Sequence, residues 1–130
     1  MLDSYSQIKI VDFGLGKIIS QNEKVFEEFG TLTYVAPEVL QKKGYNKEVD
    51  VWSLGIILFY LLVGKLPFTD PANDKSNIVN KIFKREVSLP KHIISSINPL
   101  GLDLLKRCLS EQWARISIED FINHGWFLTN

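Results

Sequence analysis

The stretch 51–64 limits what this chain can fold into more than any other feature, because it has the pattern of a helix with apolar side chains on every side. A helix that is apolar around its whole circumference must be covered by protein or by lipid. The run is far shorter than the roughly 20 residues that a membrane-spanning helix needs, and Asp50 and Lys65 bound it. We therefore expect a central core helix, capped by Asn46, with other segments packed around it.

Four further segments combine capping residues with the apolar spacing of helices, and we expect them to surround the central helix: residues 37–41, 74–85, 98–109 and 117–123. Pro37 and Pro99 suit the first turn of a helix, where the missing N–H is not needed. Ser117 begins a pattern that resembles a capping box. A loop that contains Pro90 is expected between the second and third of these helices.

The amino end has a different pattern. Residues 7–11 combine β-branched side chains with an apolar-polar alternation, which predicts a strand, and residues 15–19 are a second, shorter candidate. Residues 20–30 are polar and without a period, which indicates a surface loop. The fold class that follows is one mainly α domain over residues 1–130, with a small β element at its N-terminus.

The amino-acid composition limits the kinds of molecule that the chain can bind and the cellular compartment in which we expect it. Lys plus Arg and Asp plus Glu number 15 each, so there is no basic field for a nucleic acid or for a membrane surface. Cys108 is the single cysteine, which excludes an internal disulfide and a CxxC metal site. The amino end has no signal-peptide pattern. We expect no nucleic-acid partner, no membrane partner and a cytoplasmic location.

Several short motifs follow one another along the chain, each of them weak alone: Asp12-Phe13-Gly14, Gly30-Thr31, Ala36-Pro37-Glu38, the string DVWSLG at 50–55, and Arg115. Their order and spacing resemble the C-terminal lobe of protein kinases, from the start of the activation segment to the final helix. The string GTLTYVAPE at 30–38 is similar to the GTxxYxAPE of serine/threonine kinases. Residues 44–46, 52–55 and 61–68 most resemble the calcium/calmodulin-dependent group, including its protein kinase D-like branch.

The resemblance implies a cofactor-binding role for Asp12, Phe13 and Gly14 and a parent enzyme that uses ATP and Mg²⁺. Phosphoryl transfer needs hard cations, which prefer carboxylate oxygen, so Asp12 is implied as a metal ligand. Phe13 would switch between active and inactive packing, and Gly14 would supply the necessary backbone freedom. The alternative is that Asp12 only caps a turn.

The resemblance also implies a surface that receives the protein substrate, formed by Thr31, Leu32, Thr33, Tyr34 and Val35. Packing of the loop is the alternative explanation for these five residues.

Three further residues are implied to be structural. Glu38 and Arg115 resemble an ion pair that ties the activation segment to the helices. Asp50 resembles a buried aspartate, which would here have unsatisfied acceptors. His124 is also expected to be structural.

Residues 25–29 contain no Ser or Thr that could be phosphorylated. Glu27 or Glu28 would then supply the negative charge by pairing with an arginine, and a solvated acidic loop is the alternative.

The 130 residues contain no Gly-rich phosphate loop, no lysine of the VAIK type, no αC glutamate and no HRDxxxxN loop. The catalytic set is therefore incomplete. We expect this polypeptide alone to be inactive, to bind ATP and Mg²⁺ unstably, and to need the N-terminal lobe of a parent kinase as its partner. The alternative function is a non-catalytic module, derived from a kinase lobe, that binds substrates or partners.

Overall fold

The structure is a computed structural model that describes residues 1–20 and 23–128, without the side chain of His92. Helix α2 (Glu48–Val63) lies at its centre. Trp52, Ile56 and Phe59 on this helix are almost completely buried, which confirms that it is the central core helix. The expectation that it is covered on every side is wrong, because Ile57, Tyr60 and Leu61 are exposed on another face. The helix ends at Gly64, whose φ of 77° is the left-handed conformation that glycine adopts at little cost. None of the described helices has the length and apolar content needed to cross a bilayer.

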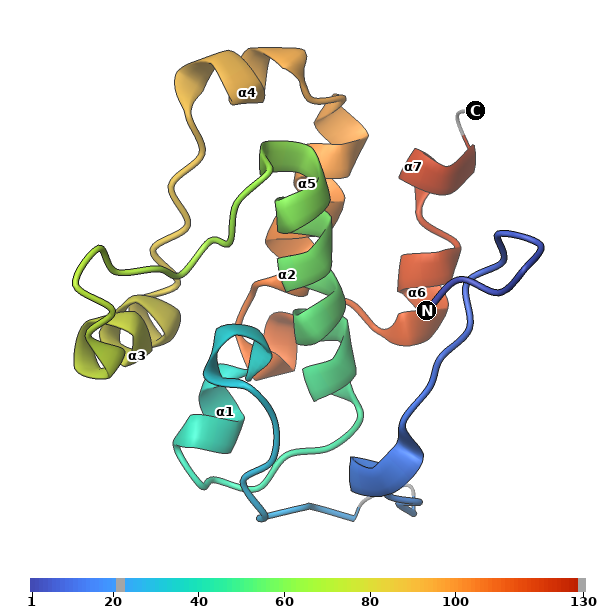
Figure 1. Ribbon diagram of the computed structural model, residues 1–130, viewed down its shortest axis with the longest axis vertical. Helices are drawn as coiled ribbons and strands as arrows, with labels where there is room; N and C mark the ends of the chain where they lie inside the picture. Colours follow the sequence, from blue (N-terminus) through green and yellow to red (C-terminus); the bar gives the residue numbers. More distant parts are fainter. Residues whose placement is uncertain (21–22, 129–130) are drawn as a thin grey trace.

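The other helices surround α2 (Figure 1). Helix α5 (Pro99–Cys108) packs along α2, and α7 (Gly125–Leu128) packs against α5. The remaining described helices are α1 (Pro37–Leu40), α3 (Lys75–Lys84), α4 (Lys91–Ser96) and α6 (Ile118–Ile122), with short 3-10 turns η1 (Phe13–Leu15), η2 (Leu32–Tyr34) and η3 (Gln112–Ala114). Their apolar faces meet in one core around Trp52.

Side-chain capping explains where α3, α5 and α6 begin. The Asn98 side chain accepts a hydrogen bond from the Leu100 N–H at 2.9 Å, and the Ser117 hydroxyl accepts one from the Asp120 N–H at 3.0 Å. The four helices predicted around the centre are confirmed.

Two predictions about the helices are wrong. Helix α4 follows Pro90 directly, where only a loop was expected. The N-cap of α2 is Lys47 and not Asn46, because the Asn46 side-chain oxygen faces the Gln112 amide at 3.5 Å instead.

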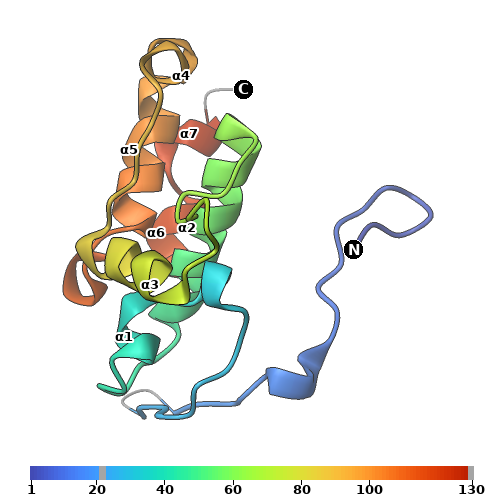
Figure 2. The ribbon, with the colours of Figure 1, turned by 60° about the vertical axis from the view of Figure 1, so that its left-hand side comes forward.

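Residues 1–20 form an amino-terminal arm, most of which projects away from the helical body (Figure 2). The strands predicted at 7–11 and 15–19 do not form, and the β element at this end is an isolated antiparallel bridge between Leu2 and Ile8. A strand needs backbone partners, and these residues have no neighbouring sheet in the described chain. Their apolar side chains are consequently exposed, with Ile18 at 99%. The mainly α class is confirmed.

The predicted surface loop at 20–30 is irregular in its described part, and its residues 21 and 22 lie outside the described residues. It contacts the helical body through a second isolated bridge, between Val25 and Tyr45.

Candidate functional site

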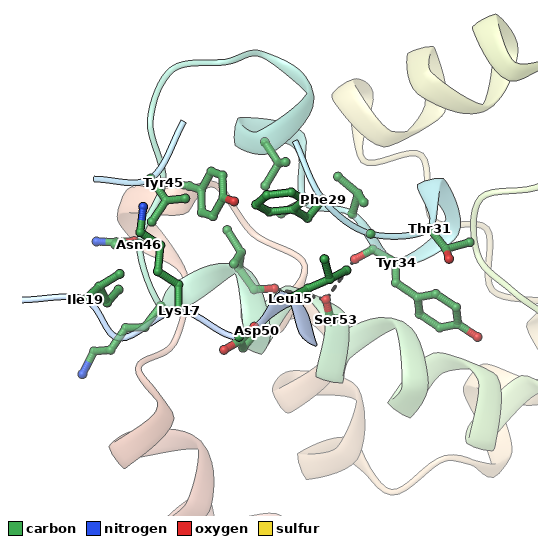
Figure 3. A pocket seen from close by; sticks show the side chains of 18 residues that line it. Leu15, Lys17, Ile19, Phe29, Thr31, Tyr34, Tyr45, Asn46, Asp50 and Ser53 are labelled. Atoms are coloured by element: carbon green, nitrogen blue, oxygen red, sulfur yellow. Dashed lines mark hydrogen bonds between the residues drawn. The ribbon is translucent and has the colours of Figure 1, made fainter. Parts of the chain in front are cut away.

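A groove of about 350 Å³ lies where the amino-terminal arm, the segment 25–36 and the first half of α2 approach one another (Figure 3). Its walls are mainly apolar, and polar side-chain groups come from Lys17, Thr31, Tyr34, Tyr45, Asn46, Lys47, Asp50 and Ser53. The groove brings together residues more than thirty positions apart in the sequence. It is the natural place to look for the predicted site.

One wall of the groove comes from the turn η2 and its flanks, where Thr31, Tyr34 and Val35 face the groove. The Ser53 hydroxyl, one turn into α2, lies 3.0 Å from the Tyr34 carbonyl oxygen and 3.2 Å from the Val49 carbonyl oxygen, and donates to them (Figure 3). This contact attaches the turn to the central helix. Sequence reasoning did not single out Ser53, although it lies within the DVWSLG string.

Of the five predicted substrate-binding residues, Thr31, Tyr34 and Val35 line the groove, whereas Leu32 and Thr33 lie in the same turn outside its lining. The segment 31–35 is called the substrate wall below, after its predicted role. Leu32 and Val35 pack against the core, whereas Thr31 and Tyr34 are exposed. An exposed hydroxyl beside an exposed aromatic ring, on a turn anchored by apolar neighbours, can contact another polypeptide. Loop packing accounts for Leu32 and Val35 and leaves the two exposed side chains without an explanation.

Glu38 and Arg115 form a two-point ion pair 77 residues apart in the sequence. Arg115 Nη1 and Nη2 donate to the two carboxylate oxygens, the second at 3.0 Å, and both side chains are buried. The pair joins α1, which follows the segment 31–35, to the loop before α6. Its geometry is the one implied by the resemblance.

The Arg115 guanidinium also binds groups other than Glu38. It donates to the Glu48 carbonyl oxygen at 3.0 Å and to the Ser110 carbonyl oxygen at 3.3 Å. It lies over the Trp52 ring, 5.2 Å from the ring centre, and Trp52 stacks on Phe68. Both terminal nitrogens of this buried cation therefore have partners, whereas its Nε has no hydrogen-bond partner among the described residues.

The expectation for Asp50 is wrong. The structure places its side chain at the groove, exposed rather than buried. Neighbouring protein atoms still remove part of its water, and this desolvation raises the pKa of Asp50 above its ordinary value. The first turn of a helix lacks covering segments on the groove side here, which explains why the side chain reaches solvent.

Asp12, Phe13 and Gly14 lie on the arm and not with the wall. Asp12 has a φ of 64° and accepts a hydrogen bond from the Gly14 N–H at 3.3 Å, so it caps the turn η1. The Phe13 ring is exposed. The described residues contain no group of three side chains that could hold a metal ion, and Asp12 alone does not fit the oxygen-rich site that Mg²⁺ needs.

Glu27 and Glu28 pair with lysines, in contrast to the arginine that was expected. Lys17 Nζ lies 3.1 Å from the Glu27 carboxylate, and Lys42 Nζ lies 2.6 Å from the Glu28 carboxylate. The Glu27 pKa is lowered by backbone hydrogen bonds and by Lys17. Both carboxylates therefore take part in contacts that cross between segments, rather than standing only in water.

His124 has two structural contacts. Its Nδ1 accepts from the Trp126 N–H at 3.2 Å at the start of α7, which leaves the hydrogen on Nε2, 3.1 Å from an Asp103 carboxylate oxygen. This arrangement joins α5 to α7.

Comparison with known proteins agrees with the order of motifs. Residues 1–127 match the family model described as protein kinase domain. The chain is 45% identical over 121 residues to an Aurora kinase of Dictyostelium discoideum, an alignment that covers 92% of this chain and 30% of that protein. It is 39% identical over 127 residues to the serine/threonine-protein kinase dkf-1 of Caenorhabditis elegans (97% and 17%). It is 42% identical over 130 residues to the serine/threonine-protein kinase PLK1 of Xenopus tropicalis (98% and 21%). The chain thus spans less than a third of the length of these relatives.

Proposed function

The chain belongs to the protein kinase family, and we propose that it is the C-terminal-lobe part, over residues 1–130, of an enzyme that transfers the γ-phosphate of ATP to serine or threonine of protein substrates. The observation that carries the proposal is the wall 31–35. It is fixed to the core at Ser53 on one side and by the Glu38–Arg115 pair on the other, and it presents Thr31 and Tyr34 to solvent. Three relatives named as kinases, two of them as serine/threonine kinases, support the same activity.

The cofactors of this proposal are ATP and Mg²⁺ in the complete kinase. Asp12 would be one oxygen ligand of the cation, and Phe13 and Gly14 would set the position of that aspartate. Because the described residues do not form a metal site by themselves, we propose that residues 1–130 alone bind neither group stably and transfer no phosphate. The N-terminal lobe of the parent kinase is the partner that this requires.

The kinase subgroup, the cellular location and the excluded partners are further parts of the proposal. The likeness of residues 61–68 to the calcium/calmodulin-dependent group and its protein kinase D-like branch stays a proposal, since the relatives carry the names of several kinase kinds. A cytoplasmic location, and the lack of nucleic-acid and membrane partners, rest on the balanced charge and on a single buried cysteine. A non-catalytic binding module would use the same wall, and no separate observation favours it.

The test uses the complete kinase that carries this sequence, with a serine- or threonine-containing peptide and radiolabelled ATP. We expect Asp12→Asn to lower phosphate transfer by orders of magnitude, because it removes the metal-binding charge. Asp3→Asn, which alters an aspartate on the same arm, is the matched control and should keep its activity. Phosphate transfer by purified residues 1–130, or full activity of Asp12→Asn, would contradict the proposal.

A further inference from the structure

The segment 25–28 is joined to the loop 42–45, between α1 and α2, by paired backbone hydrogen bonds. The Val25 N–H donates to the Tyr45 carbonyl oxygen at 2.8 Å, and the Tyr45 N–H donates back to the Val25 carbonyl oxygen at 2.9 Å. Val25 is buried at this point, although most of its neighbours in the segment are exposed. The crossing of these two segments is called the clasp below.

The Tyr45 side chain strengthens the same crossing. Its hydroxyl donates to the Glu27 carbonyl oxygen at 2.7 Å. Burial, and next the Glu27 carboxylate, raise the pKa of Tyr45, so the hydroxyl keeps the hydrogen that it donates. Tyr45 therefore holds the segment through its backbone and its side chain together.

Gly44 shows how closely the two segments approach. Its φ of 75° is left-handed, and a Cβ at this position would lie 2.9 Å from the Phe26 ring and 3.0 Å from the Lys24 side chain. Only glycine combines that conformation with that approach. The loop is thus shaped to fit beneath residues 24–26.

Two ion pairs flank the clasp, Glu28 with Lys42 and Glu27 with Lys17. All four side chains are largely exposed, and pairs of this kind contribute little to stability. The bridge and the Tyr45 hydroxyl consequently dominate the clasp, and the charges help to orient the segment.

The clasp lies immediately before the substrate wall. Val25, Phe29 and Tyr45 line the same groove as Thr31 and Tyr34, and only two residues separate Glu28 from Thr31. We propose that Tyr45 is a positioning residue that, through the clasp, holds the substrate wall 31–35 in the shape that receives a protein substrate. Residues 21–30 contain no Ser, Thr or Tyr, so the clasp needs no phosphate within them.

The first test measures amide hydrogen exchange in the chain of residues 1–130 and does not depend on any enzyme activity. Tyr45→Phe removes only the hydroxyl, and we expect the Val25 and Tyr45 amides to exchange about twofold to tenfold faster, as the loss of one hydrogen bond implies. Tyr5→Phe, an exposed tyrosine on the arm, is the matched control and should leave both rates unchanged. Unchanged exchange in Tyr45→Phe would overturn the clasp.

The second test uses the complete kinase and rests on the proposed function. We expect Tyr45→Phe to raise the KM for a peptide substrate severalfold while KM for ATP and kcat change little. A general loss of structure would lower kcat and weaken the binding of both peptide and ATP. A change in the peptide KM alone therefore distinguishes a positioning role from a folding defect. Faster exchange with an unchanged peptide KM would overturn the positioning role. Absence of kinase activity in the unmodified complete protein would instead refute the proposed function. The amide-exchange test would then be the one that decides whether Tyr45 holds the clasp.

Discussion

Replacing Arg115 by alanine is the sharpest test of how the substrate wall is held. The change removes both donors of the Glu38 carboxylate and leaves that carboxylate buried without its counter-charge. It also removes the donors to the Glu48 and Ser110 carbonyl oxygens and the cation above the Trp52 ring. The perturbation is therefore concentrated at the junction of the wall, α2 and the loop before α6.

The expected loss follows from the burial of the pair. Breaking one partner of a buried ion pair costs about 3–5 kcal/mol, because the remaining charge is left without compensation. A domain of this kind has about 5–15 kcal/mol of stability in total, so Arg115→Ala should remove about a fifth of it or more. With a urea dependence of about 1–3 kcal/mol per molar, the midpoint of unfolding should fall by about 2 M.

The assay is urea unfolding of residues 1–130 followed by tryptophan fluorescence, for which Trp52 beside the pair is an internal reporter. Lys47 and Glu119 give a matched control, since they also join distant segments, at 3.2 Å, but both side chains are exposed. Glu119→Gln should change the free energy of unfolding by less than about 0.5 kcal/mol.

Two results would refute the reasoning. The first is an Arg115→Ala midpoint within the error of the unmodified chain. The second is an equal loss in Arg115→Ala and Glu119→Gln, because burial would then not be what makes the pair strong. Glu38→Gln and the double variant complete a cycle, whose coupling energy should be at least about 1 kcal/mol for residues in direct contact.

Three other changes test separate parts of the structure. Gly55→Ala should destabilise the chain by about 1–3 kcal/mol in the same urea assay, since its Cβ would lie 2.7 Å from the Cys108 Cβ and 2.9 Å from a Leu109 methyl carbon; an unchanged midpoint would show that α2 and α5 are less tightly packed. Burial raises the pKa of Cys108 from 9.0 to about 12, so the unfolded thiol ionises first and the free energy of unfolding should fall by about 1.4 kcal/mol per pH unit between those values. The Cys108→Ala variant has no thiol and should not show this fall. Equal pH dependence of the free energy of unfolding in the variant and the unmodified chain from pH 8 to 11 would contradict the prediction. Ser53→Ala should cost about 0.5–1.5 kcal/mol by releasing the Tyr34 carbonyl, and in the complete kinase it should raise the peptide KM while leaving KM for ATP unchanged.

How far the sequence predicts this fold depends on how local each signal is. The starts of α5 and α6 follow from Asn98 and Ser117, whose side chains bond amides two and three residues away. The strand predicted at 7–11 has the correct alternation but lacks a partner, and strand formation is decided by segments distant in the sequence. The prediction that Asp50 is buried was wrong for the same reason, since the exposure of its side chain depends on which other segments cover the start of α2.

The candidate site shows the same division. The motifs located the wall 31–35 and the two ends of the Glu38–Arg115 contact, because each has a recognisable string. Lys17 lies in no such string, and the string at 44–46 that contains Tyr45 assigned that residue no role. Both roles became visible only when the fold placed the two side chains against Glu27. A tyrosine after a glycine, three residues before the start of a helix, is too common a feature to indicate that contact.

The two halves of the predicted site differ in what fixes them, and this difference bears on function. The wall 31–35 is bonded to the central helix by the Ser53 hydroxyl, and the segments on either side of it are held by the clasp and by the buried Glu38–Arg115 pair, all of them contacts between residues distant in the sequence. Within the described residues, the one hydrogen bond of the Asp12 side chain is with Gly14 in its own turn, and Asp12 lies on an arm whose apolar side chains are exposed. Local stability follows the density of such distant contacts. The wall should therefore keep its structure whether or not the arm is ordered, and in the proposed enzyme substrate docking and nucleotide binding would depend on separately stabilised parts of the chain.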